Sequence, residues 1–161
     1  IARTARETVR DMDEIVWAVN PKNDTVEDLA NYLCAFAREH FELTSTRLHL
    51  ELPAQLSEFP LPADARHNLF LATKEALNNI VKHAGAADAW LKIELADGTL
   101  AITIRDNGKG LSTQPGARRG QGQENIRRRL DQIGATLECR SEPGQGTCLV
   151  ASLPLHPLSL S

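Results

Sequence analysis

The sequence predicts an α+β fold: a two-layer α/β sandwich with helices on one face of a mixed, mostly antiparallel sheet, preceded by one further helix. The expected elements follow the order helix, helix, strand, helix, strand, strand, helix, strand, strand. The strand candidates alternate apolar and polar residues, and the helix candidates are apolar along one side only. One-sided helices covering one face of such a sheet bury both apolar surfaces.

Length and composition are those of one ordinary globular domain. The 161 residues can bury a real core, and 42% of them are hydrophobic and 24% charged. A net charge of −3 does not indicate direct binding to nucleic acid. The three cysteines are too few for a disulfide framework, which favours a reducing, cytoplasmic location. No apolar run approaches the roughly 20 residues that span a bilayer.

The first segment carries a heptad pattern. Its small or apolar residues recur at alternating steps of three and four: Ala2, Ala5, Val9, Met12, Val16 and Val19. This helix could pack on its own domain, but so short a seam is better explained by partners in an intermolecular bundle. We therefore expect residues 1–22 to be the last part of a dimerisation bundle, its second helix only. Because the chain begins inside this helix, we expect it to be part of a longer, homodimeric protein.

Residues 23–154 are expected to form one domain, followed by a disordered tail at 155–161. A helix should begin at a cap on Asp24 or Thr25, and Leu48, Leu50 and Leu52 mark a strand. The remaining elements are a helix over 63–83, strands over 89–96 and 99–105, a helix over 124–133, and a hairpin over 136–141 and 147–153. Asp97-Gly98 is a typical hairpin turn, and Gly85 and Gly134 are typical helix ends.

Four polar residues share one side of the helix expected over 63–83. Glu75, Asn79, Lys82 and His83 are spaced four, three and one apart, opposite the apolar stripe. A solvated surface would explain this pattern if it stood alone. However, three glycine-rich segments follow, and they suggest a joint site: Asp106-Asn-Gly108-Lys-Gly110, Gly120-Gln-Gly122, and Gly144-Gln-Gly146-Thr147.

These residue types suit a nucleotide site that has no P-loop. Asn79 offers a neutral oxygen to Mg²⁺, and Lys82 can meet phosphate. Backbone amides after Gly120 and Gly122, at the start of a helix, can bind phosphate oxygens. Asp106 can accept from the adenine amine, whereas the carbonyl of guanine would be repelled. Gly108 and Gly110 are interpreted as letting the backbone approach the base.

The four segments resemble the N, G1 and G2 boxes and the final G-x-G-T of the family that comprises gyrase, the Hsp90 chaperone, histidine kinases and the mismatch-repair ATPase. "KEALNNIVKHA" (74–84) and "VWAVNPKNDTVEDL" (16–29) resemble sensor histidine kinases of the nitrate-sensor type. The resemblance covers residues 1–153. It implies a Bergerat-type ATP-binding fold and ATP with Mg²⁺ as cofactors. It also implies a response regulator with a helix-turn-helix output domain as partner, and a parent protein that can be membrane-anchored.

The resemblance also implies roles for single residues. Glu75 is similar to the acid that assists the attacking group, Asn79 to the magnesium ligand and Lys82 to the phosphate contact. Asp106 with Thr147 matches the pair that holds adenine, with Gly108, Gly110, Gly120 and Gly122 completing the boxes. His83 is expected to pack or to hydrogen-bond near the phosphates. Arg118 and Arg119, in the short segment between G1 and G2, remain open between phosphate contacts and solvated charges.

Two departures from the family pattern matter. The second box usually reads G-H-G-L, but this chain has Gln121 and Gln123 at the second and fourth positions. None of the five histidines has the sequence context of the phosphate-accepting histidine. We therefore expect the catalytic domain of a histidine kinase whose acceptor lies on a helix outside these residues. The alternatives are an ATP hydrolase or switch kinase of the same fold, and a transfer-dead nucleotide-binding module.

Overall fold

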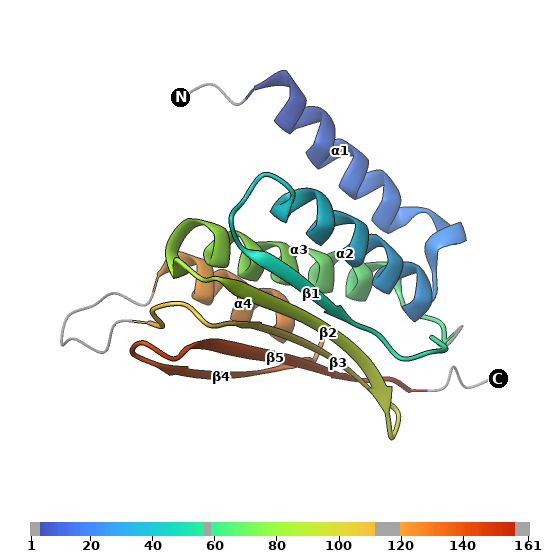
Figure 1. The fold of residues 1–161 in the computed structure, drawn as a ribbon. Coiled ribbons are helices and arrows are strands. Elements are labelled where there is room, and N and C mark those ends of the chain that lie inside the picture. The colour runs from blue at the N-terminus through green and yellow to red at the C-terminus, as the bar shows by residue number, and fades with distance from the viewer. Residues whose placement is uncertain (1–3, 57–58, 112–119, 157–161) are drawn as a thin grey trace.

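The computed structural model describes residues 4–56, 59–111 and 120–156, and it confirms the α/β sandwich (Figure 1). Its five-stranded sheet has the order β1-β2-β3-β5-β4. Strands β1 and β2 run parallel and the other neighbours antiparallel, so the sheet is mixed and mostly antiparallel, as predicted. The elements are α1 Ala5–Val19, η1 Pro21–Asn23, α2 Val26–Phe41, β1 Arg47–Glu51, α3 Ala63–Asn79, η2 Ile80–Ala84, β2 Asp88–Ala96, β3 Thr99–Asp106, α4 Gln121–Asp131, β4 Thr136–Glu142 and β5 Gly146–Pro154.

The core lies between the sheet and a layer of three helices. Helices α2, α3 and α4 lie over one face of the sheet, and no described element covers the opposite face (Figure 1). Leu91 of β2 and Ile102 of β3 point into the core together with Leu69 and Leu77 of α3, and all four are buried. Each fully buried side chain of this kind stabilises the fold by about 1.5–3 kcal/mol.

Two local signals behave as the sequence predicts. Asp97 and Gly98 both have positive φ, at 53° and 71°, which is the geometry of the type I′ turn that joins β2 to β3. Gly85 takes the left-handed conformation directly after the helical segment. Both positions depend on local backbone geometry, which is why turn chemistry alone located them.

The helix expected over 63–83 is not a single α-helix. Regular α-helix ends at Asn79, and residues Ile80–Ala84 continue it as a π-helical turn. A π-turn holds more residues per turn, so it changes the direction in which Lys82 and His83 leave the helix. The sequence periodicity did not indicate this wider turn.

Helix α4 begins earlier than the expected residue 124. It starts at Gln121 and therefore contains Gly122 in its first turn. A Cβ atom at position 122 would lie 2.5 Å from Oε1 of Glu75, so a larger residue here would displace the Glu75 carboxylate. Glycine disfavours helix by about 1 kcal/mol, which is why the sequence pattern placed the start too late.

Helix α1 lies on the side of α2 and α3 that faces away from the sheet (Figure 1). The Trp17 ring stacks on the Tyr32 ring of α2 with centroids 4.0 Å apart. Nη2 of Arg66, on α3, donates to the carbonyl of Ala18 at 2.6 Å. Nζ of Lys74 lies 2.6 Å from Oε1 of Glu14. One side of α1 is thus attached to this domain.

The heptad residues of α1 lie on its other side. Val9, Met12, Val16 and Val19 are between 56% and 64% exposed, as large apolar residues rarely are. The contacts of α1 agree with packing on its own domain, while the intermolecular bundle and the boundary at residue 22 stay predictions. Ala2 of the heptad pattern, and residues 157–161 of the expected tail, lie outside the described residues. Leu155 belongs to the expected disordered tail, yet its backbone N–H donates to the Gly98 carbonyl at 2.7 Å.

Candidate nucleotide site

A cavity of about 540 Å³ lies where α3, η2, the end of β3, the start of α4 and the start of β5 meet. Of the ten predicted site residues, nine line it: Glu75, Asn79, Lys82, His83, Asp106, Gly110, Gly120, Gly122 and Thr147. Gly108 does not line the cavity and packs behind it. Four segments that are far apart in the sequence therefore converge on one hollow.

Asp106 is the last residue of β3 and is only 6% exposed. Its carboxylate accepts a hydrogen bond from the backbone N–H of Gly108 at 2.8 Å and another from the N–H of Thr147. Burial raises the pKa of Asp106, and these two amides partly oppose that rise. A carboxylate has about four acceptor positions, so Asp106 can accept from a further donor inside the cavity.

The glycines of the site pack against backbone atoms. A methyl group on Gly108 would overlap the carbonyl of Ala84, and one on Gly146 would overlap the carbonyl of Asp106. Gly110 is equally close to the carbonyl of Glu142. From the sequence, Gly108 is interpreted as letting the backbone approach the base. In the structure, the Gly108 backbone instead lies close to Ala84 of η2. These glycines hold the strand ends and η2 together around Asp106.

Glu75 and Asn79 face the first turn of α4. A Cβ on Gly122 would lie 2.5 Å from Oε1 of Glu75 and 3.3 Å from Oδ1 of Asn79. The missing side chain therefore lets one carboxylate oxygen and one amide oxygen lie close against the first turn of α4. Oxygen donors of these two kinds are the ligands that Mg²⁺ prefers, so the residues fit a magnesium ion shared with a phosphate.

Basic side chains also line the cavity. Lys82, His83 and Lys109 line it. Gly120 is the N-cap of α4 and supplies no side-chain cap. The uncapped amides of the first turn lie at the positive end of the helix dipole, where an anion is stabilised. Arg118 and Arg119 lie outside the described residues.

Sequence reasoning missed the apolar floor of the cavity and one organising hydroxyl. Ile80, Ile104 and Leu149 line the cavity and are buried. Oγ of Ser141, on β4, accepts from the backbone N–H of Leu111 at 2.8 Å and lies 3.0 Å from Oγ1 of Thr147. Ile104 could have been found from strand alternation, because it points to the same face as Asp106. Nothing local in the sequence marks Ser141.

Residues 64–157 match the family model described as histidine kinase-, DNA gyrase B- and HSP90-like ATPase. This match covers more than half of the chain, and the fold and cavity agree with it. The chain therefore belongs to this family of ATP-binding domains.

Within this family, the chain is similar to sensor proteins and to histidine kinase structures. It is 28% identical over 110 residues to the sensor protein VraS of Staphylococcus aureus, covering 68% of this chain. The VraS protein of Staphylococcus saprophyticus gives the same identity and coverage. The match takes in 32% of each of these proteins, so the chain aligns with about a third of their length.

Solved structures share the fold at low sequence identity. The histidine kinase domain of the Erythrobacter litoralis EL346 blue-light activated histidine kinase superposes with a TM-score of 0.67 at 20% identity, over 79% of this chain and 61% of that one. The Acinetobacter baumannii histidine kinase AdeS gives 0.65 at 11% identity, over 94% and 78%. Within the described ranges, no helix has the length and apolar composition needed to cross a bilayer.

Proposed function

We propose that this domain binds ATP with Mg²⁺ and transfers the γ-phosphate to a histidine on a helix outside the 161 residues, as the catalytic domain of a two-component sensor histidine kinase. The observation that carries the proposal is the convergence of Glu75, Asn79, Asp106 and the first turn of α4 on one cavity. A buried acceptor, two oxygen donors and a helix N-terminus in one hollow suit a nucleoside triphosphate.

Adenine is proposed to lie on the apolar floor made by Ile104 and Leu149. Its exocyclic amine would donate to the Asp106 carboxylate, which the Gly108 and Thr147 amides hold in place. A guanine carbonyl at that point would face the carboxylate and be repelled. Adenine specificity therefore follows from the acceptor character of a single side chain.

The triphosphate is proposed to extend from the base toward Lys82 and the amides of α4. Asn79 is the protein group placed to hold a magnesium ion together with phosphate oxygens, with Glu75 beside it. Bound there, the ion supplies charge neutralisation of the triphosphate. The chain's own contribution is to hold the phosphate chain in line and to screen its charge with Lys82.

Glu75 is proposed to assist the incoming imidazole. The nitrogen of the accepting histidine forms a bond to the γ-phosphorus while the bond from that phosphorus to the β–γ bridging oxygen breaks, and ADP leaves. The attacking nitrogen is the unprotonated one, and the proton on the other ring nitrogen passes to the Glu75 carboxylate. The phosphate then moves to an aspartate of a response regulator, which we propose carries a helix-turn-helix output domain.

The exposed stripe of α1 supports dimerisation of the parent protein. Val9, Met12, Ile15, Val16 and Val19 are each more than half exposed on one helix. We propose that they form part of a helical bundle between two copies, on the cytoplasmic side of a protein that can be membrane-anchored. In sedimentation runs, Val16→Glu should lower self-association of the parent, while Thr8→Glu on the same helix should not. Equal association of both variants would argue against the bundle.

Radiolabelled ATP tests the proposed transfer. The 161-residue chain should bind ATP without labelling itself, whereas the parent protein should acquire acid-labile, base-stable phosphate that a response regulator removes. Release of free phosphate without a protein-bound intermediate would instead indicate an ATP hydrolase. If the parent protein with Asn79→Ala keeps its function without phosphate transfer, the domain would be a transfer-dead nucleotide-binding module. Labelling of the 161-residue chain on one of its own histidines would contradict the location of the acceptor.

A further inference from the structure

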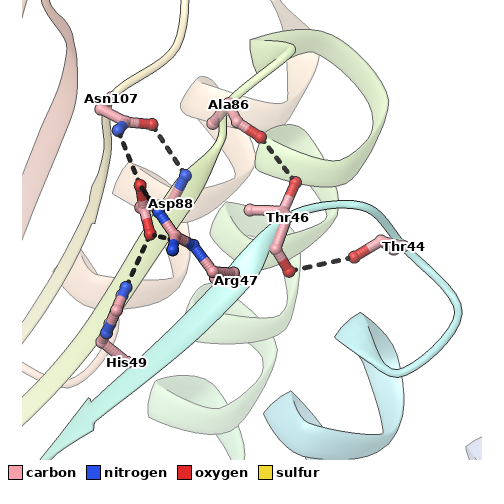
Figure 2. A network of polar contacts seen from close by, with 7 residues as sticks. All are labelled: Thr44, Thr46, Arg47, His49, Ala86, Asp88 and Asn107. Carbon is pink, nitrogen blue, oxygen red and sulfur yellow. Dashed lines mark hydrogen bonds and ion pairs between the residues drawn. The ribbon is translucent and has the colours of Figure 1, made fainter.

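A polar network lies behind the cavity, at the ends of β1, β2 and β3 (Figure 2). Its centre is Asp88, the first residue of β2, whose side chain is 13% exposed. Oδ1 of Asp88 lies 2.8 Å from Nε2 of His49 and 3.0 Å from Nε of Arg47. Oδ2 accepts from Nη2 of Arg47 and from Nδ2 of Asn107, both at 3.2 Å. The carboxylate is thereby fixed from three sides.

Asp88 and Asn107 bind each other through both backbone and side chains. The backbone N–H of Asp88 donates to Oδ1 of Asn107 at 2.8 Å, while Nδ2 of Asn107 donates back to the Asp88 carboxylate. The backbone N–H of Asn107 donates to the Asp88 carbonyl at 3.2 Å. We call these three bonds the Asp88–Asn107 clasp. It extends the β2–β3 pairing by one residue beyond the last register pair, Ala89 with Asp106.

Asn107 is the middle residue of the turn that holds Asp106. Gly108 donates its N–H to the Asp106 carboxylate, so both peptide groups of Asn107 lie inside a ring that this hydrogen bond closes. Rotation about the Asn107 backbone would break that bond and release the carboxylate. The clasp fixes Asn107, and it therefore fixes the direction of the Asp106 side chain.

The same turn is held from the opposite side by η2. Lys109 donates its N–H to the Ala84 carbonyl at 2.9 Å, and Gly108 packs directly on Ala84. The turn is thus held by main-chain contacts on the cavity side and by the Asp88–Asn107 clasp on the open face of the sheet. Two of the three clasp bonds depend on side chains, so these two can be removed by substitution without touching the cavity.

We propose that Asp88 and Asn107 are positioning residues of the nucleotide site, which aim the Asp106 carboxylate at the base without contacting the nucleotide. Arg47 and His49 support them by holding the Asp88 carboxylate. This inference rests on the proposed function, because it takes Asp106 to be the adenine acceptor. It predicts that loss of the clasp weakens recognition of the base and spares recognition of phosphate.

Calorimetry with two probes tests this: ADP, which carries the base, and inorganic tripolyphosphate, which does not, each with magnesium. Asn107→Ala and Asp88→Ala should weaken ADP binding about five- to tenfold, the loss of one hydrogen bond, and should change tripolyphosphate binding less than about twofold. Glu94→Ala is the matched control, because Glu94 pairs with Lys92 further along β2 and should change neither.

A double exchange supplies a rescue. In Asp88→Asn/Asn107→Asp the amide and the carboxylate trade places, so one side-chain donor and one acceptor again face each other and ADP affinity should recover to within about threefold. Asn107 lies on an exposed turn, so Asn107→Ala keeps the test available if Asp88→Ala does not fold. Melting temperatures of all variants accompany the titrations.

Three results would overturn the inference. Equal weakening of both probes would mean that the clasp stabilises the domain in general. Unchanged ADP binding in Asn107→Ala, beside a weakened Asp106→Asn, would mean that the turn holds itself, and the proposed function would stand. No loss of ADP affinity in Asp106→Asn would remove the adenine assignment, and the proposed function would fail together with the inference.

Discussion

Asp106, at the end of β3, and Asn79, at the end of α3, line the same cavity. One residue comes from the sheet and the other from the helix layer, so the cavity lies between the two layers of the sandwich. Ile104, two residues before Asp106, contributes to the apolar floor between them. A ligand that touches both residues would meet the Asp106 carboxylate at the strand and the Asn79 amide at the helix.

Asp106→Asn should weaken ATP binding while the domain stays folded. The variant loses a charge-assisted hydrogen bond to the adenine amine, which is worth about 1.5–3 kcal/mol, or roughly a 10- to 150-fold rise in Kd. Calorimetry on both proteins measures the change. Asp97→Asn, in the β2–β3 turn, is the matched control, because Asn-Gly suits that turn as well as Asp-Gly. An unchanged Kd in Asp106→Asn would refute the adenine contact.

ATP affinity should fall in acid through the titration of Asp106. Burial raises the pKa of this carboxyl in the empty domain, so protonation begins at a higher pH than for an ordinary aspartate. The ionised form is the better acceptor, and affinity should therefore be lost as the pH falls through the raised pKa. Dividing the wild-type Kd by that of Asp106→Asn at each pH removes the titration of the phosphates. A ratio that does not change with pH would contradict the assignment.

Asn79→Ala should remove the magnesium dependence of nucleotide binding. The amide oxygen is placed beside Glu75 and the first turn of α4, and its loss removes one ligand of the proposed ion. We expect ATP affinity in the variant to be nearly the same with magnesium and with a chelator, whereas the wild type should differ by at least about tenfold. Asn68→Ala, on the exposed side of the same helix, should keep the full difference.

Gly108→Ala should destabilise the domain far more than Gly120→Ala. A methyl group on Gly108 overlaps the Ala84 carbonyl, whereas a Cβ on Gly120 meets nothing within 4 Å. Overpacking against backbone typically costs about 1–3 kcal/mol, and the open position should cost less than about 0.5 kcal/mol. Urea unfolding measures both. Similar stabilities would mean that η2 can move away from the G1 turn.

Arg66→Met should weaken the attachment of α1 to the domain. The guanidinium is 2% exposed and donates to the Leu61 and Ala18 carbonyls at 2.5 Å and 2.6 Å. Methionine fills much of the same space but leaves both carbonyls without this donor, at a cost of about 2–4 kcal/mol. Urea unfolding gives the loss, and proteolysis within α1 should become faster. Arg127→Met on the exposed side of α4 serves as the control, and equal stability of both variants would contradict this role.

The sequence by itself indicated most of the elements and nine residues that line the cavity. Helix and strand periodicity, the Asp97-Gly98 turn and the Gly85 stop are local signals, because each depends on a few neighbouring residues. The spacing of Glu75, Asn79 and Asp106 relative to the glycines was sufficient to predict a nucleotide site, and it indicated the family. These features require only short-range geometry and the chemistry of side-chain types.

Only the tertiary structure decided how those residues are held. In the sequence, Asn107 is typical of a turn and Asp88 of the polar start of a strand. Only the register of β2 and β3 brings the two residues together. Ser141 gains its role in the same way, when β4 pairs with β5 and brings it to Thr147. Such contacts join residues that lie on or next to different strands. Their partners follow from strand register and helix packing, which no local pattern specifies.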